Sequence, residues 1–180
     1  MGERVGAAAL FGQPLTLLGR EIKVGESAQD FTVIRPDFRT YSLNDGRGEL
    51  RLVASLPSLD TPVCDAEARR FSEEAAKLGM TVLLVSADLP FAQTRWCAAN
   101  GIDNVTMLSD HRDVSFGMAF GVAIKELRIL SRALFVVDPE NRVRHAEYVT
   151  ELSDHPDYDA ALASLSELLV EARSPEVGPF

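Results

Sequence analysis

Cysteine is scarce in this chain, and basic residues are too few to balance the acidic ones. Two cysteines occur in 180 residues, and 18 lysines and arginines face 27 aspartates and glutamates, for a net charge of −9. With a pI near 4.8, the chain is not expected to bind nucleic acid or an anionic membrane as its main partner. So few cysteines, without an export signal, fit a reducing compartment in which permanent disulfides are rare.

Long hydrophobic runs are missing as well. No segment approaches the roughly 18 apolar residues of a membrane span. The apolar run at residues 5–11 is short and is followed by Gly12 and Pro14, which is not typical of a signal peptide. We therefore expect a cytoplasmic protein.

The sequence also contains no recognisable metal-binding pattern. The three histidines, His111, His145 and His155, are scattered, and with the two cysteines they form no C-x-x-C or H-x-x-x-H pattern. We therefore expect no metal site and no other cofactor. The missing C-x-x-C also argues against a disulfide reductase of the thioredoxin type.

What the chain does contain is an alternation of strand-like and helix-like segments. The composition, with 46% hydrophobic and 25% charged residues, is ordinary for one folded domain of this length. We therefore expect a single domain over residues 1–180. The expected strands are 15–19 (part of a hairpin), 31–34, 50–55, 81–86, 105–108, 133–137 and 143–149. The expected helices are 62–78, 90–99, 114–120 and 157–172. This order predicts an α/β fold, with a mixed central sheet and helices on both faces, and with flexible ends at residues 1–9 and 174–180.

The stretch P-S-L-D-T-P-V-C, residues 57–64, places one cysteine at a helix start. Thr61 followed by Pro62 is a typical N-cap and first helical position, so Cys64 falls in the first turn. The helix dipole there favours a thiolate, but it supplies only about 0.3–1 kcal/mol. Ionising a thiol almost fully at neutral pH takes roughly 3 kcal/mol. We therefore expect a second positive group, an arginine brought in by the fold, unless Cys64 is an inert core cysteine.

Several motifs resemble those of a known family. Pro57, Thr61 and Cys64 form P-x-x-x-T-x-x-C after an expected strand, which is similar to the active-site loop of the peroxiredoxins. The run S-A-D-L-P-F-A-Q-T-R-W-C, residues 86–97, resembles the thiol peroxidase subfamily, the atypical two-cysteine peroxiredoxins. An opening with Phe11, Gly12, Pro14 and Thr16 and a late P-D-Y-D-A-A-L also match, so the likeness spans roughly residues 10 to 170.

The resemblance implies a thioredoxin-like fold with an N-terminal β-hairpin, a homodimer, and reduction of alkyl hydroperoxides and hydrogen peroxide with electrons from thioredoxin. By position, Cys64 would be the peroxidatic nucleophile and Cys97 the resolving thiol, joined in an intrachain disulfide after oxidation. Thr61 and Pro57 would shape the pocket, and Arg132 would lie against the thiolate and the peroxide. An apolar mouth would be lined by Leu56, Leu59, Val63 and nearby phenylalanines.

Less specific interpretations stay open for each residue. Thr61 could serve as an N-cap alone, Arg132 as a solvated charge at a strand end, and Cys97 as a core cysteine. The whole chain could be a non-catalytic thioredoxin-fold module for redox sensing or binding. Two departures from the family pattern also stand out: Leu56 replaces an aromatic residue, and the segment 124–132 is shorter than usual.

Overall fold

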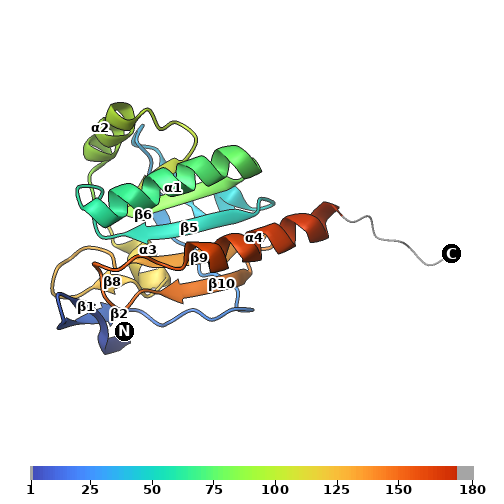
Figure 1. Ribbon diagram of the computed structural model, residues 1–180. Coiled ribbons are helices and arrows are strands. Elements are labelled where there is room, and N and C mark those ends of the chain that lie inside the picture. Colours follow the sequence, from blue (N-terminus) through green and yellow to red (C-terminus); the bar gives the residue numbers. More distant parts are fainter. Residues whose placement is uncertain (1, 174–180) are drawn as a thin grey trace.

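The computed structural model describes residues 2–173, so the expected flexible tail at 174–180 lies outside the described residues. Within this range a seven-stranded mixed sheet is accompanied by a three-stranded sheet (Figure 1). The strands of the larger sheet are β3 (Thr32–Ile34), β4 (Thr40–Ser42), β5 (Arg51–Leu56), β6 (Thr81–Ser86), β7 (Thr106–Ser109), β9 (Ala133–Val137) and β10 (Val143–Tyr148). Those of the smaller sheet are β1 (Glu3–Leu10), β2 (Gln13–Leu18) and β8 (Ala123–Ile124).

The larger sheet has the spatial order β10-β9-β5-β6-β7-β3-β4. The pairs β5–β6 and β6–β7 are parallel, and β9 pairs antiparallel with β5. Every residue of β5 and β9 is buried. Both faces of these strands are covered, which is why their sequences read as continuous runs rather than as an alternation of apolar and polar residues.

The helices begin and end close to the residues that the sequence predicts. They are α1 (Pro62–Leu78), α2 (Pro90–Asn100), α3 (Ser115–Ala119) and α4 (Tyr158–Arg173), with a 3-10 turn η1 (Leu43–Gly46). Helix α1 ends at Gly79, whose φ of 63° is left-handed and suits glycine. Gly101 closes α2 in the same way, with φ 64°.

Helices cover both faces of the larger sheet, as expected. Side chains of α1, α2 and α4 join one apolar cluster with β5, β6 and β9, represented by Phe71, Trp96 and Leu165. In Figure 1, α1 and α4 cross the same face of the sheet. Phe116 and Phe120, in and just after α3, pack in a second cluster on the opposite face. Of the helices in residues 2–173, none is long and apolar enough to cross a membrane.

The N-terminal segment corrects one expectation. Residues 1–9 were expected to be flexible, yet Glu3–Leu10 forms β1, which pairs antiparallel with β2. The Ala9 N–H also donates to the Thr150 carbonyl oxygen across 2.6 Å. Short strands 40–42 and 123–124 were likewise not expected. Alanine and glycine give β1 little strand preference of its own, so its order comes from long-range pairing.

Candidate active site

The loop between β5 and α1 meets the start of β9 because of how these two strands pair. Ser55 of β5 lies opposite Ala133 of β9 in an antiparallel register. The residue before Ala133 is therefore placed where β5 ends and the chain turns toward α1. This pairing brings Arg132 to the first turn of α1, although the two segments are far apart in sequence.

Cys64 lies in that first turn, as the sequence predicts. Helix α1 starts at Pro62, so Cys64 is its third residue, near the free backbone N–H groups of the helix start. The side chain is fully buried, and both Cys64 and Cys97 are free thiols. The Arg132 Nη2 group donates to Cys64 Sγ across 3.2 Å. The expected positive group is therefore present at the thiol.

Arg132 is itself buried, with 1% of its surface exposed, which excludes the interpretation as a solvated charge. Its Nε and Nη2 groups donate to the Leu152 carbonyl oxygen at 3.3 and 3.1 Å. Its Nη1 group donates to Oε2 of the buried Glu67 carboxyl. Four donor contacts from one planar guanidinium fix its plane and aim it at the sulfur.

Glu67 is the site residue that sequence reasoning missed. It follows Cys64 by three positions on α1, a spacing that puts both side chains on one helix face. Glu67 is fully buried, and its Oε1 atom has no hydrogen-bond partner among the described residues. Burial raises the pKa of this carboxyl to about 8, although Arg132 acts in the opposite direction. An acidic residue on the buried stripe of α1 was the signal that could have found it.

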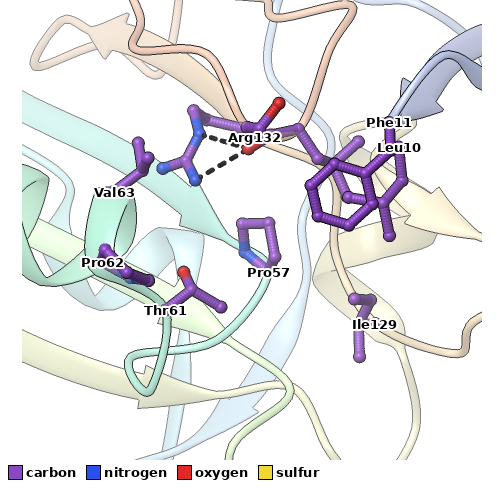
Figure 2. Close-up of a pocket in the computed structure, with 10 residues that line it drawn as sticks. Leu10, Phe11, Pro57, Thr61, Pro62, Val63, Ile129 and Arg132 are labelled. Atoms are coloured by element: carbon purple, nitrogen blue, oxygen red, sulfur yellow. Dashed lines mark hydrogen bonds between the residues drawn. The ribbon is translucent and has the colours of Figure 1, made fainter.

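A cavity of about 420 Å³ opens beside the guanidinium. Its walls are mostly apolar, and its lining residues are Leu10, Phe11, Pro57, Thr61, Pro62, Val63, Ile129, Arg132, Leu152 and Ser153. Figure 2 shows Pro57 and Thr61 on the side of the α1 loop, and Phe11 with Leu10 on the opposite side. Cys64 does not line the cavity; Arg132 is the residue that both faces the cavity and contacts the sulfur.

The apolar mouth differs in part from the expectation. Val63 and a phenylalanine, Phe11, do line the cavity. Leu56 and Leu59 are buried in the apolar cluster beneath α1 and are not among the lining residues. The replacement of an aromatic residue by Leu56 therefore changes the core rather than the wall of the cavity.

Thr61 is the N-cap by backbone geometry, but its hydroxyl does not cap the helix. The Thr61 Oγ1 group instead donates to the Ser58 carbonyl oxygen across 3.1 Å. The loop around it is held by Asp88, whose carboxylate accepts from the Ser58 hydroxyl and the Leu59 N–H, both at 2.8 Å. The Thr61 side chain is thus fixed at the edge of the cavity, near Pro57 and Arg132.

Cys97 is not brought to the other site residues. It lies on α2, is half-buried against the apolar cluster that also holds Cys64, and forms no disulfide. Burial raises the pKa of its thiol. The end of α2 is tied to α1 instead by a contact between neighbours of the two cysteines: the Trp96 indole N–H donates to Asp65 Oδ1 across 3.0 Å.

Metal-binding residues do not gather in the described part of the chain. Within residues 2–173, no group of three or more His, Cys, Asp or Glu side chains could hold a metal ion.

Comparisons with known proteins find similarity over most of the chain. Residues 23–162 match the family model described as Redoxin. The chain is 55% identical over 159 residues to a thiol peroxidase of Bacillus subtilis (strain 168), which covers 88% of this chain and 95% of that protein. A thiol peroxidase of Halalkalibacterium halodurans is 53% identical over 159 residues, covering 88% and 96%.

A solved structure shows the same arrangement of elements. The crystal structure of a peroxiredoxin-like protein from Aquifex aeolicus superposes with a TM-score of 0.84 at 37% identity, covering 91% of this chain and 98% of that one. The fold is thus thioredoxin-like, and its site is a buried cysteine at a helix start held by an arginine. The chain belongs to the Redoxin family, which confirms the resemblance to the peroxiredoxins and their thiol peroxidase subfamily.

Proposed function

We propose that this protein is a thiol-dependent peroxidase that reduces hydroperoxides with Cys64 as the nucleophile. The observation that carries the proposal is the 3.2 Å contact between Arg132 Nη2 and Cys64 Sγ at the start of α1. A buried thiol held by a cation beside an open cavity is suited to attack on a small oxidant. Relatives that are thiol peroxidases, at 55% and 53% identity, support the same activity.

In the first step, the Cys64 thiolate attacks the terminal oxygen of the peroxide. An S–O bond forms and the O–O bond breaks, so that sulfur is oxidised to a sulfenic acid. The other oxygen leaves with the bonding electron pair and takes a proton, giving water from hydrogen peroxide or an alcohol from an alkyl hydroperoxide. A peroxide in the cavity can contact Arg132, because that side chain lines the cavity and also donates to the sulfur.

Ionisation of the thiol supplies only part of the rate. A few per cent of an ordinary thiol is already ionised at neutral pH, so complete ionisation gains about thirty-fold. The remainder must come from stabilising the charge that develops on the leaving oxygen. The donors at hand are the Arg132 guanidinium and the backbone N–H groups of Val63 and Cys64; the Thr61 hydroxyl can join them only by leaving the Ser58 carbonyl oxygen. Pro57, on the cavity wall, limits the access of water.

In the second step, the Cys97 thiol attacks the sulfenic acid, releasing water and forming an intrachain disulfide with Cys64. A dithiol reductant of the thioredoxin type then reduces this bond and restores both thiols. The two cysteines lie on separate helices and are unbonded, so α1 or α2 must unwind locally before they meet. The half-buried position of Cys97 suits such a rearrangement.

We further propose that the protein works as a homodimer in the cytoplasm. Phe91 at the start of α2 is 69% exposed and stacks at a tilt on Phe38, which is 55% exposed. Exposed aromatic pairs of this kind favour association. A chain with two cysteines suits a reducing compartment.

The alternative is a thioredoxin-fold module that senses or binds without turnover, and one experiment separates the two. Wild type and Cys64→Ser are mixed with hydroperoxide in the presence of a thioredoxin system, and peroxide consumption is followed. The peroxidase consumes peroxide through many turnovers, and Cys64→Ser is inactive because serine is not ionised at neutral pH. A Cys64→Ser variant that still turns over would refute the nucleophile, and a single stoichiometric reaction in wild type would support the alternative.

A further inference from the structure

One carboxylate holds the tip of the β1–β2 hairpin. The Phe11 N–H donates to Glu151 Oε1 and the Gly12 N–H to Glu151 Oε2, both at 3.0 Å. These two residues form the turn between β1 and β2, and both have positive φ, 51° and 75°. Phenylalanine is strained in this region, because its Cβ crowds the backbone there. The bidentate carboxylate is therefore well placed to stabilise the turn.

The chain around Glu151 also contacts the arginine of the site. Leu152, the next residue, offers its carbonyl oxygen to Nε and Nη2 of Arg132. Its N–H donates in turn to the Ala9 carbonyl oxygen across 2.9 Å. The segment 150–153 thus joins the guanidinium to the hairpin. The hydrogen bond from the Gly12 backbone lowers the pKa of Glu151. The Ser153 hydroxyl also donates to Glu151 Oε1, across 3.0 Å, so both contacts favour the ionised carboxylate.

The Phe11 side chain, at this turn, forms part of the cavity wall. Phe11 lines the cavity and is 80% exposed (Figure 2). When a second apolar surface covers a large apolar group in open solvent, both surfaces leave water, and this burial is favourable. Hydrogen peroxide has no substituent that could reach Phe11 from a position at Arg132. An alkyl or aryl hydroperoxide has one.

We propose that Glu151 is a positioning residue that sets the preference of this site for hydroperoxides with large apolar substituents, by holding Phe11 over the cavity. The proposal rests on the peroxidase function proposed above. Glu151 has no contact with the peroxide; it acts through the backbone of Phe11 and Gly12. Its loss therefore weakens binding of the apolar substituent more than it affects attack on the O–O bond.

The experiment compares cumene hydroperoxide with hydrogen peroxide in four variants of the full chain. Glu151→Gln keeps one acceptor oxygen but places an amide group against a backbone N–H. Phe11→Ala removes the wall itself, and a double variant combines both changes. Glu126→Gln is the matched control, because the Glu126 carboxylate accepts the Thr16 N–H at 3.2 and 2.9 Å on the same hairpin but away from the cavity.

The measured quantity is the ratio of kcat/KM for cumene hydroperoxide to that for hydrogen peroxide. Loss of apolar contacts in a pocket typically changes such a ratio by about 10-fold. We expect Glu151→Gln and Phe11→Ala to lower it several-fold through KM for cumene hydroperoxide, with the double variant no lower than Phe11→Ala. Amide exchange at Phe11 and Gly12 should be faster in Glu151→Gln, and Glu126→Gln should keep the wild-type ratio.

Two results would overturn the inference while leaving the peroxidase function intact. In one, the ratio of Glu151→Gln equals that of active wild type. In the other, both kcat/KM values fall in parallel, which means that Glu151 supports only the general structure of the site. A wild-type protein that reduces neither peroxide refutes the proposed function instead, and this result is recognised before any variant is compared.

Discussion

Arg132 and Cys64 are 68 positions apart in the chain, and the guanidinium Nη2 group lies 3.2 Å from the sulfur. The same guanidinium pairs with the buried Glu67 carboxyl on its Nη1 side. One buried cation is therefore shared by two groups that can each become anionic. The protonation state of Glu67 decides how much of the Arg132 charge remains for the thiolate and the peroxide.

Replacing Arg132 tests whether the cation acts only on the thiol or also on the leaving oxygen. Loss of one such donor typically costs 10²–10³-fold in rate, so we expect Arg132→Ala to lower kcat/KM for hydroperoxide by roughly 100-fold. Arg132→Lys keeps the charge without the planar fork and should fall in between. The measurement is single-turnover oxidation followed across pH. Full recovery of the Arg132→Ala rate at high pH would restrict the cation to favouring the thiolate.

The raised pKa of Glu67 predicts a pH-dependent stability. Burial moves this pKa from 4.5 to about 8, so between these values the folded protein holds a proton that the unfolded chain has lost. The folded state then binds more protons, and its free energy of unfolding falls as pH rises through this window. Glu67→Gln removes the titrating group and should flatten this decline. Denaturant unfolding at several pH values measures this free energy. If it falls with pH equally in wild type and in Glu67→Gln, the raised pKa of Glu67 is contradicted.

Cys97 is tested by the product of oxidation. One equivalent of peroxide should convert wild type into a monomer lacking two hydrogens, with a Cys64–Cys97 bond that closes a loop of roughly 33 residues. Cys97→Ser should instead gain oxygen, stop turning over with a thioredoxin system, and proceed to the sulfinic acid in excess peroxide. Intact mass spectrometry distinguishes the products. A disulfide-linked dimer of wild type would place resolution between chains.

The contact between Asp65 and Trp96 should limit the rate of resolution. Asp65 accepts from the Trp96 indole at 3.0 Å and from Arg69 Nε at 2.9 Å, which ties α1 to α2 beside both cysteines. A hydrogen bond to a charged group stabilises by about 1.5–3 kcal/mol, so Asp65→Ala, which removes the acceptor, should ease local unwinding by about 10-fold or more. The variant should form the disulfide faster and accumulate less sulfinic acid at equal peroxide.

Stopped-flow fluorescence of Trp96 measures the rate of disulfide formation, and mass spectrometry measures the amount of sulfinic acid. Glu74→Gln is the matched control, because the Glu74 carboxylate pairs with Lys77 on the same helix rather than with α2. Trp96→Phe removes the same hydrogen bond from the other side and should repeat the effect in the mass spectra. Unchanged sulfinic acid in both Asp65→Ala and Trp96→Phe would show that this contact does not limit resolution.

Local features of the fold were available from the sequence because their causes are local. Thr61-Pro62 and Gly79 mark the ends of α1, and the apolar run 81–86 marks a strand covered on both faces. The same local signals place Cys64 in the first turn of a helix. The motifs around Cys64 and Cys97 indicate the family, since they combine residue type with spacing along the chain.

The sequence by itself therefore determined the helices, the longer central strands, the family and the position of Cys64 on its helix, whereas the tertiary structure decided what surrounds the sulfur. The pairing of Ser55 with Ala133 brings Arg132 to Cys64, and that register joins segments which no local pattern connects. The role of Glu67 as the partner of Arg132 and the ordering of β1 depend on the same kind of contact. Periodicity and capping act within a few residues, while strand register and burial are set by the whole fold.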